Sequence, residues 1–108
     1  MTGTRMICLV LVIASLCGCS ERINYVIDGD TVVALGHEKI RLLGIDCPEL
    51  DCFAGVMARE YVVDYIKDKP IRIVRWKKDK YGRTLAWIFV DGVNLSEHLL
   101  TKGCRRWK

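Results

Sequence analysis

Residues 23–45, INYVIDGDTVVALGHEKIRLLGI, decide the fold of this chain. Three runs rich in β-branched and apolar residues are predicted strands: Ile23–Ile27, Thr31–Leu35 and Lys39–Ile45. Between the first two runs, Asp28-Gly29 is typical of a tight hairpin turn, and Gly36-His37-Glu38 makes the next turn. The stretch therefore predicts an antiparallel meander of three strands.

A helix and two further strands follow the meander. The helix is predicted over about Gly55–Lys67, and Pro70 stops it. Its apolar residues recur at helical spacing on one face: Ala58, Tyr61, Val62, Tyr65 and Ile66. Ile71–Trp76 and Thr84–Val90 are predicted strands, joined by the loop Lys77–Gly82.

A short second helix is predicted near the C-terminus. Asn94 suits its N-cap, Glu97 completes a capping box, and Gly103 suits its end. Elements in this order match a five-stranded OB-fold barrel, a mainly β domain with two short helices. Four aromatic residues fall at core-compatible positions and are expected to be structural rather than to stack on bases: Tyr65, Trp76, Trp87 and Phe89.

The N-terminal segment is expected to be an export signal. Arg5 precedes the apolar run Met6–Leu16, which is shorter than the about 20 residues that span a bilayer. Leu16-Cys17-Gly18-Cys19 resembles a bacterial lipobox. We therefore expect a lipoprotein-type signal peptide over 1–18, a domain over 19–108, and a lipid anchor at Cys19 to the cell membrane or outer membrane, facing the periplasm or the exterior. The alternative is a plain signal and a soluble secreted protein.

Charge and cysteine content set looser bounds. The chain has 17 Lys and Arg against 13 Asp and Glu, a mild excess that favours a polyanionic ligand without requiring one. Beyond the signal and Cys19, three cysteines remain: Cys47, Cys52 and Cys104. An exported protein can form one disulfide from them, and the pairing stays open. Zinc is not expected, because no further cysteine or histidine lies at finger-like spacing.

Four motifs lie along the predicted barrel, and together they resemble the staphylococcal nuclease (thermonuclease) family. They are Asp28-Gly-Asp30-Thr, Arg41-Leu-Leu-Gly-Ile-Asp46-x-Pro48-Glu49, Asp79-Lys-Tyr81-Gly-Arg83 and the Asn94–Gly103 helix. The resemblance covers roughly Tyr25–Gly103. It implies a calcium-dependent endonuclease that hydrolyses DNA, RNA or both and leaves 3′-phosphate ends. We expect a monomer, and a domain without the last helix of the family.

Two carboxylates are candidate metal ligands. Asp30 follows a tight turn and Asp46 ends a strand before Pro48, so they can converge on one cation from adjacent strands. Such oxygen ligands favour calcium or magnesium. The resemblance implies calcium, bound by Asp30, Asp46 and the backbone carbonyl of Cys47. Asp28 would contact these ligands and not the ion itself.

The same motifs contain candidate catalytic residues. A carboxylate at Glu49 can accept a proton from an attacking water, and the resemblance assigns it the role of general base. Arg41 and Arg83 carry guanidinium groups that bind two phosphate oxygens at once and stabilise transition-state charge. By resemblance, Lys80 and Tyr81 contact a terminal phosphate of the substrate.

Two other functions stay open at this point. The barrel can serve as a non-enzymatic module that binds nucleic acid or protein at the cell envelope. It can also belong to an envelope lipoprotein that blocks incoming DNA. The presence of Glu49 and both arginines favours the enzyme.

Overall fold

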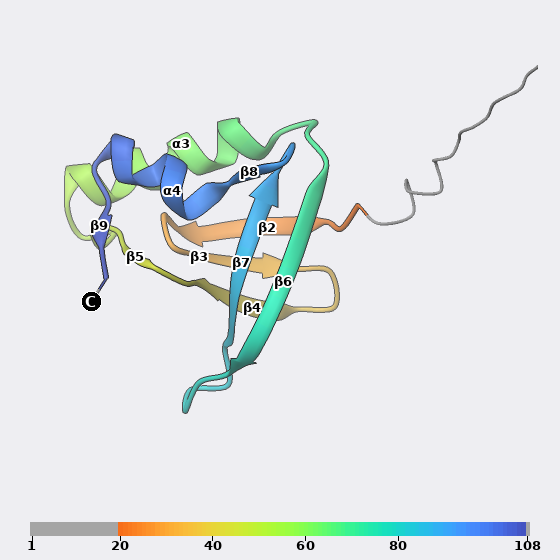
Figure 1. Cartoon of the computed structure of the whole chain (residues 1–108). Helices are drawn as coiled ribbons and strands as arrows, with labels where there is room; N and C mark the ends of the chain where they lie inside the picture. The colour runs from red at the N-terminus through yellow and green to blue at the C-terminus, as the bar shows by residue number, and fades with distance from the viewer. Residues whose placement is uncertain (1–19, 108) are drawn as a thin grey trace, which may run out of the picture.

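The computed structural model describes residues 20–107, a strongly bent sheet with two helices packed across one end (Figure 1). The predicted signal peptide and Cys19 lie outside these residues and stay predictions. Main-sheet strands are β2 (Ile23–Asp28), β3 (Thr31–Ala34), β4 (Glu38–Leu42), β6 (Ile71–Lys78), β7 (Thr84–Val90) and β8 (Val93–Asn94). The other elements are β5 (Ile45–Asp46), α3 (Phe53–Ile66), α4 (Leu95–Leu99), the 3-10 turn η1 (Leu100–Lys102) and β9 (Arg105–Arg106).

The strand order is β2-β3-β4-β7-β6, with β8 beside β7, and β5 and β9 form a separate two-stranded ribbon. Neighbours in the main sheet are antiparallel except β4 and β7, which are parallel. This is the order of an OB-type sheet, so the predicted mainly β class with two helices is confirmed. Within residues 20–107 the outer edges meet at one bridge, between Glu21 and Ile71, rather than along a ladder.

Alternation along the strands separates a buried face from an outer face. Ile40 and Leu42 on β4 are fully buried, so Arg41 between them points to the other face. On β7, Ala86 and Ile88 belong to the core, while Trp87 between them is only half-buried. The helix α3 covers the core with Ala58, Val62 and their neighbours, as its predicted apolar face required. No helix of residues 20–107 is long and apolar enough to cross a membrane.

The predicted third strand, Lys39–Ile45, is wrong in one respect. The chain pairs as β4 only to Leu42, and Gly44 then adopts a φ of +84°. Only glycine adopts this conformation readily, so the strand breaks there and β5 leaves in a new direction. Consequently Asp46 pairs with Arg105 of β9 rather than extending the main sheet.

Trp76 is the second correction, because its side chain is 64 % exposed rather than part of the core. Along β6 it follows the outward phase of the exposed Val74, and the β-bulge between Arg75 and Lys77 leaves it without a partner residue on β7. The other aromatic residues with the same prediction, Tyr65, Trp87 and Phe89, are half-buried.

The termini of the helices follow the sequence closely. The α3 helix begins at Phe53, two residues before the predicted start. Asn94 caps α4, since its Oδ1 accepts a hydrogen bond of 2.9 Å from the amide of Ser96. The predicted capping box is not formed among the described residues: the carboxylate of Glu97 does not bond back to Asn94 but lies 3.7 Å from Arg106 on β9. Gly103, with a φ of +99°, ends the helical segment as predicted.

The cysteine pairing left open by the sequence is Cys47 with Cys104, both buried, while Cys52 is free and exposed among the described residues. The bond joins β5 to the segment before β9, 57 residues further along the chain. It therefore fixes the C-terminal residues beside the meander.

Candidate active site

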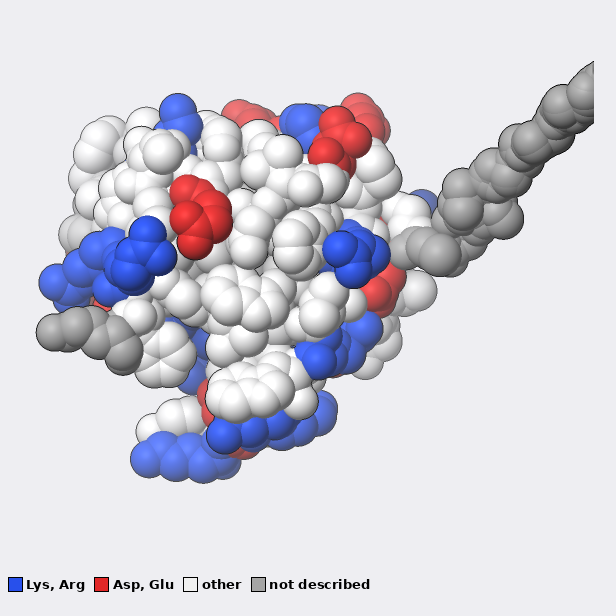
Figure 2. All heavy atoms as spheres, viewed as in Figure 1, with Lys and Arg blue, Asp and Glu red and all other residues white. Residues whose placement is uncertain are grey.

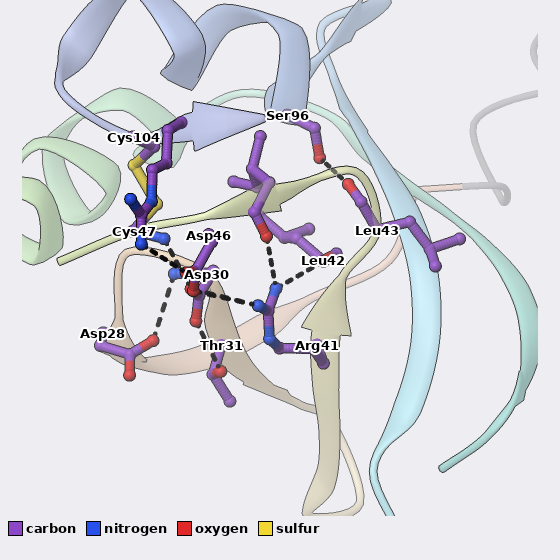
Figure 3. A network of polar contacts seen from close by, with 12 residues as sticks. Asp28, Asp30, Thr31, Arg41, Leu42, Leu43, Asp46, Cys47, Ser96 and Cys104 are labelled. Carbon is purple, nitrogen blue, oxygen red and sulfur yellow. Dashed lines mark hydrogen bonds and ion pairs between the residues drawn. A yellow bond between two sulfur atoms is a disulfide. The ribbon is translucent and has the colours of Figure 1, made fainter. Parts of the chain in front are cut away.

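Two carboxylates and one guanidinium meet where β3 begins and β4 ends (Figure 3). The Nη2 atom of Arg41 lies 3.6 Å from Oδ2 of Asp30 and 3.5 Å from Oδ1 of Asp46. Because both carboxylates approach the same nitrogen, they are close to each other. The structure thus brings together the two residues that the sequence proposed as metal ligands.

Arg41 is held firmly in this cluster. Its Nη1 donates hydrogen bonds of 2.7 Å to the carbonyl of Leu42 and 2.9 Å to that of Ile45. The turn at Gly44 folds these carbonyls around the guanidinium, and the ring of Trp107 lies 5.3 Å from its central carbon. Within residues 20–107 its Nε donates no hydrogen bond, so this nitrogen is available to a phosphate, whereas Nη2 already faces the two carboxylates.

Asp30 is buried, and both of its carboxylate oxygens accept hydrogen bonds. Its Oδ2 accepts a hydrogen bond of 2.9 Å from the amide of Cys47, and its Oδ1 accepts one of 3.1 Å from the hydroxyl of Thr31. Asp28 supports it, since Oδ1 of Asp28 accepts from the Asp30 amide at 3.1 Å. Burial, then the hydrogen bond and charge of Asp30, raise the pKa of Asp28 to about 6. Asp28 and Asp30 thus form a pair of neighbouring carboxylates at this turn.

Glu49 stands exposed on the rim of a pocket beside this cluster. The pocket is lined by Asp46, Cys47, Pro48, Glu49, Gly103 and Arg105. The main chain at Glu49 is anchored, because its carbonyl accepts hydrogen bonds from the amide of Cys52 at 3.4 Å and from its thiol at 3.3 Å. The carboxylate of Glu49 is thus free while its backbone is fixed.

Arg83, Lys80 and Tyr81 lie on the β6–β7 hairpin, whose tip projects beyond the sheet (Figure 1). Arg83 donates from its Nε to Oδ2 of Asp79 at 2.9 Å, and its amide donates to Oδ1 at 2.9 Å. Desolvation raises the pKa of Asp79, but these two hydrogen bonds and a third from the Tyr81 amide outweigh it and hold that pKa below its usual range. Asp79 thereby orients Arg83.

The structure does not place Arg83 in contact with the Asp30 cluster, but the strand register relates the two arginines. Arg41 pairs with Leu85, and Arg83 precedes Leu85 by two residues, about 7 Å along a strand. Residues two apart point to the same face. Arg83, which directly precedes β7, therefore lies two residues from the cross-strand partner of Arg41.

Two residues at the site were not predicted. Arg105 lies with its Nη2 3.7 Å from Oδ2 of Asp46, and Trp107 covers Arg41. Neither residue belongs to a motif of the site that the sequence predicts. Their place depends on the pairing of β5 with β9 and on the disulfide, and neither feature has a local signal.

Comparison with known proteins places these features in a family. A model described as "Staphylococcal nuclease homologue" matches residues 39–107, which is more than half of the chain. The chain belongs to this family. The nuclease-family match includes Arg41, Asp46, Glu49 and Arg83, while Asp30 lies ahead of the matched segment.

Individual relatives agree with the assignment to the staphylococcal nuclease family. The chain is 37 % identical over 76 residues to a probable staphylococcal-like nuclease of Oryza sativa, covering 70 % of this chain and 23 % of the relative. It is 32 % identical over 104 residues to an uncharacterized endonuclease of Haemophilus influenzae, covering 88 % and 58 %. It is 31 % identical over 103 residues to the thermonuclease of Staphylococcus intermedius, covering 84 % and 61 %. The chain thus spans less than two thirds of each of these relatives.

The donor set of the site fits a hard cation. Asp30, Asp46 and the neighbouring backbone offer oxygen atoms, which suit calcium or magnesium. Burial and then the neighbouring Asp30 raise the pKa of Asp28, and the proximity of these two carboxylates also favours a bound cation. Within residues 20–107 no three His, Cys, Asp or Glu side chains gather as a metal cluster, so the carboxylates would need carbonyl or water ligands beside them.

Proposed function

We propose that this chain is a calcium-dependent endonuclease that hydrolyses phosphodiester bonds of DNA, RNA or both and leaves 3′-phosphate ends. The observation that supports it best is the convergence of Asp30 and Asp46 on Arg41 beside the exposed Glu49, in a chain of the staphylococcal nuclease family. The relatives named as nucleases and endonucleases point the same way.

Each residue has a role that its surroundings allow. Asp30, Asp46 and the carbonyl of Cys47 would hold calcium, which supplies Lewis-acid stabilisation of a phosphoryl oxygen when bound. Glu49 accepts a proton from the attacking water, since its carboxylate is exposed at the pocket rim. Arg41 presents its free Nε to a phosphate oxygen, and its Nη2 would have to exchange Asp30 and Asp46 for a second one.

Arg83 acts from the other strand. It stabilises the negative charge that develops on the phosphate and the leaving oxygen, and Lys80 and Tyr81 on the same turn contact a terminal phosphate. Asp79 keeps the guanidinium oriented until a phosphate competes for it. The two arginines thus approach the substrate from β4 and β7.

Removal of calcium tests the proposal. Purified protein should cleave single-stranded DNA or RNA with calcium present, and cleavage should stop when a chelator removes the metal. End-labelling of the products should detect 3′-phosphates, and calcium should raise the melting temperature of the wild type but not of Asp30→Asn. Intact nucleic acid after incubation of folded protein with calcium would overturn the enzyme. Binding without cleavage would instead support a non-enzymatic OB module.

A second test concerns the backbone that carries Glu49. A Cβ atom added to Gly55 on α3 would lie 1.6 Å from the Glu49 carbonyl oxygen and 2.9 Å from the amide nitrogen of Leu50. Gly55→Ala must therefore displace Glu49, and a shift of about 1 Å can lower a rate about 10²-fold. We expect kcat to fall by that order while KM changes little.

The matched control for Gly55 is the neighbouring Ala54, which is exposed in the same helical turn. Ala54→Gly changes one methyl group without touching Glu49 and should retain activity. Full activity of Gly55→Ala would show that the position of the Glu49 backbone does not limit the reaction.

A further inference from the structure

The three tryptophans of the chain lie along one path on the outer face of the sheet, although they come from β6, β7 and the C-terminus. Trp107 covers Arg41, and its amide donates a hydrogen bond of 3.0 Å to the carbonyl of Gly44. The indole of Trp87 packs against the same glycine, since a Cβ there would lie 3.0 Å from two of its ring carbons. Trp107 and Trp87 thus meet at Gly44.

The path continues from Trp87 across the hairpin. Trp87 is the cross-strand partner of Val74, and a shallow apolar pocket is lined by Leu43, Val74, Arg75, Trp76 and Trp87. Trp76 is 64 % exposed and Trp107 is 51 % exposed. We call Trp76, Trp87 and Trp107 with this pocket the tryptophan face. It begins at the candidate catalytic Arg41 and runs away from it.

Cations border the tryptophan face where the hairpin extends beyond it. The Nζ of Lys77 lies 4.4 Å from the centre of the Trp76 ring, and Lys77 and Lys78 are exposed and form no ion pair within residues 20–107. Arg75, in contrast, is neutralised by Glu21 and Glu38, each at 2.9 Å. Figure 2 shows Lys and Arg gathered at the lower edge of the molecule, below a largely uncharged surface.

We propose that the tryptophan face binds the unstacked bases of single-stranded DNA or RNA on one side of the phosphate that is cleaved. Exposed indoles beside lysines suit a polyanion whose bases are free to stack, and this charge complementarity identifies the occupant. A duplex keeps its bases paired and cannot use the indoles in this way. The inference rests on the proposed function, and it adds a preference for single strands set by residues outside the reacting centre.

Binding can be measured apart from cleavage. Because the chain has three tryptophans and all lie on this face, tryptophan fluorescence, excited selectively over the four tyrosines, reports on it. The full chain, with a chelator present to prevent cleavage, is titrated with a twelve-nucleotide oligothymidine and with a duplex of equal length. We expect quenching and tighter binding for the single strand. No change in fluorescence with folded protein would overturn the proposal.

Trp76 is the residue to vary, because it lies on β6 and is separated by β7 from Arg41 on β4. Trp76→Ala should weaken binding of the single strand about 5- to 100-fold, the range for loss of one base stack, whereas Trp76→Phe keeps an aromatic surface and should bind nearly as the wild type. The salt dependence of binding should be unchanged in Trp76→Ala, which removes no charge. Lys77→Gln should lower its slope by about 0.7.

Two further outcomes would overturn the proposed binding of single strands, and a third would overturn only the proposed function. Equal affinity of Trp76→Ala and the wild type would overturn the proposal. So would a change from dimer to monomer in Trp76→Ala with oligonucleotide affinity intact, because the face would then join two copies of the chain. Failure of cleavage with normal binding contradicts the proposed function alone.

Discussion

Replacing Glu49 by glutamine is expected to lower kcat for nucleic-acid cleavage by about 10²- to 10⁴-fold, the usual contribution of a general base. Glutamine has nearly the same shape but cannot accept a proton. The side chain of Glu49 is exposed, and its backbone carbonyl rather than its carboxylate anchors the loop to Cys52. The substitution should therefore leave the fold, the affinity for oligonucleotide and the binding of calcium intact.

Single-turnover cleavage of a labelled oligonucleotide measures this loss without interference from product release. The matched control is Asp51→Asn, which neutralises another exposed carboxylate two residues further along the same loop and should retain activity. A Glu49→Gln variant that cleaves at the wild-type rate would remove Glu49 from the mechanism. Equal losses in both variants would indicate a general effect of loop charge instead.

Where the sequence succeeded, the deciding signals were local. The strand Thr84–Val90 and a tight turn between the first two strands follow from residue types within a few positions, and the structure has both, although the turn residues are Gly29 and Asp30 rather than Asp28 and Gly29. The apolar face of α3 follows from helical spacing. The proximity of Asp30 and Asp46 was also accessible, since Asp30 adjoins the turn into the second predicted strand and Asp46 directly follows the third.

Where the sequence failed, the deciding contacts were distant. Trp76 was expected at a core-compatible position, but it is the unpaired residue of a bulge formed with β7 and lies on the exposed face. The roles of Arg105 and Trp107 depend on the pairing of β9 with β5, some 60 residues earlier in the chain. They also depend on a disulfide whose two cysteines the number and spacing of cysteines in the sequence did not identify. Residues at the site that come from one motif were predictable, and those delivered by long-range pairing were not.

Loss of the Cys47–Cys104 disulfide has the largest expected effect on stability. The bond closes a loop between residues 57 apart, and the chain-entropy model gives about 4 kcal/mol for a loop of this length. Native disulfides of small domains typically contribute about 2–5 kcal/mol. Replacing both cysteines by alanine should lower the free energy of unfolding by about that amount, measured by urea denaturation under oxidising conditions. Cys52→Ala, at the free exposed cysteine, is the control and should unfold as the wild type.

The same substitution should affect the site, because β5 and β9 pair over only two residues each. A ribbon this short is not stable alone, so without the disulfide Arg105 and Trp107 should leave Asp46 and Arg41. Reductant should therefore weaken oligonucleotide binding by the wild type and have no effect on the double alanine variant. If wild type and variant unfold at the same urea concentration, or if reductant changes both equally, the disulfide does not hold the C-terminal residues at the site.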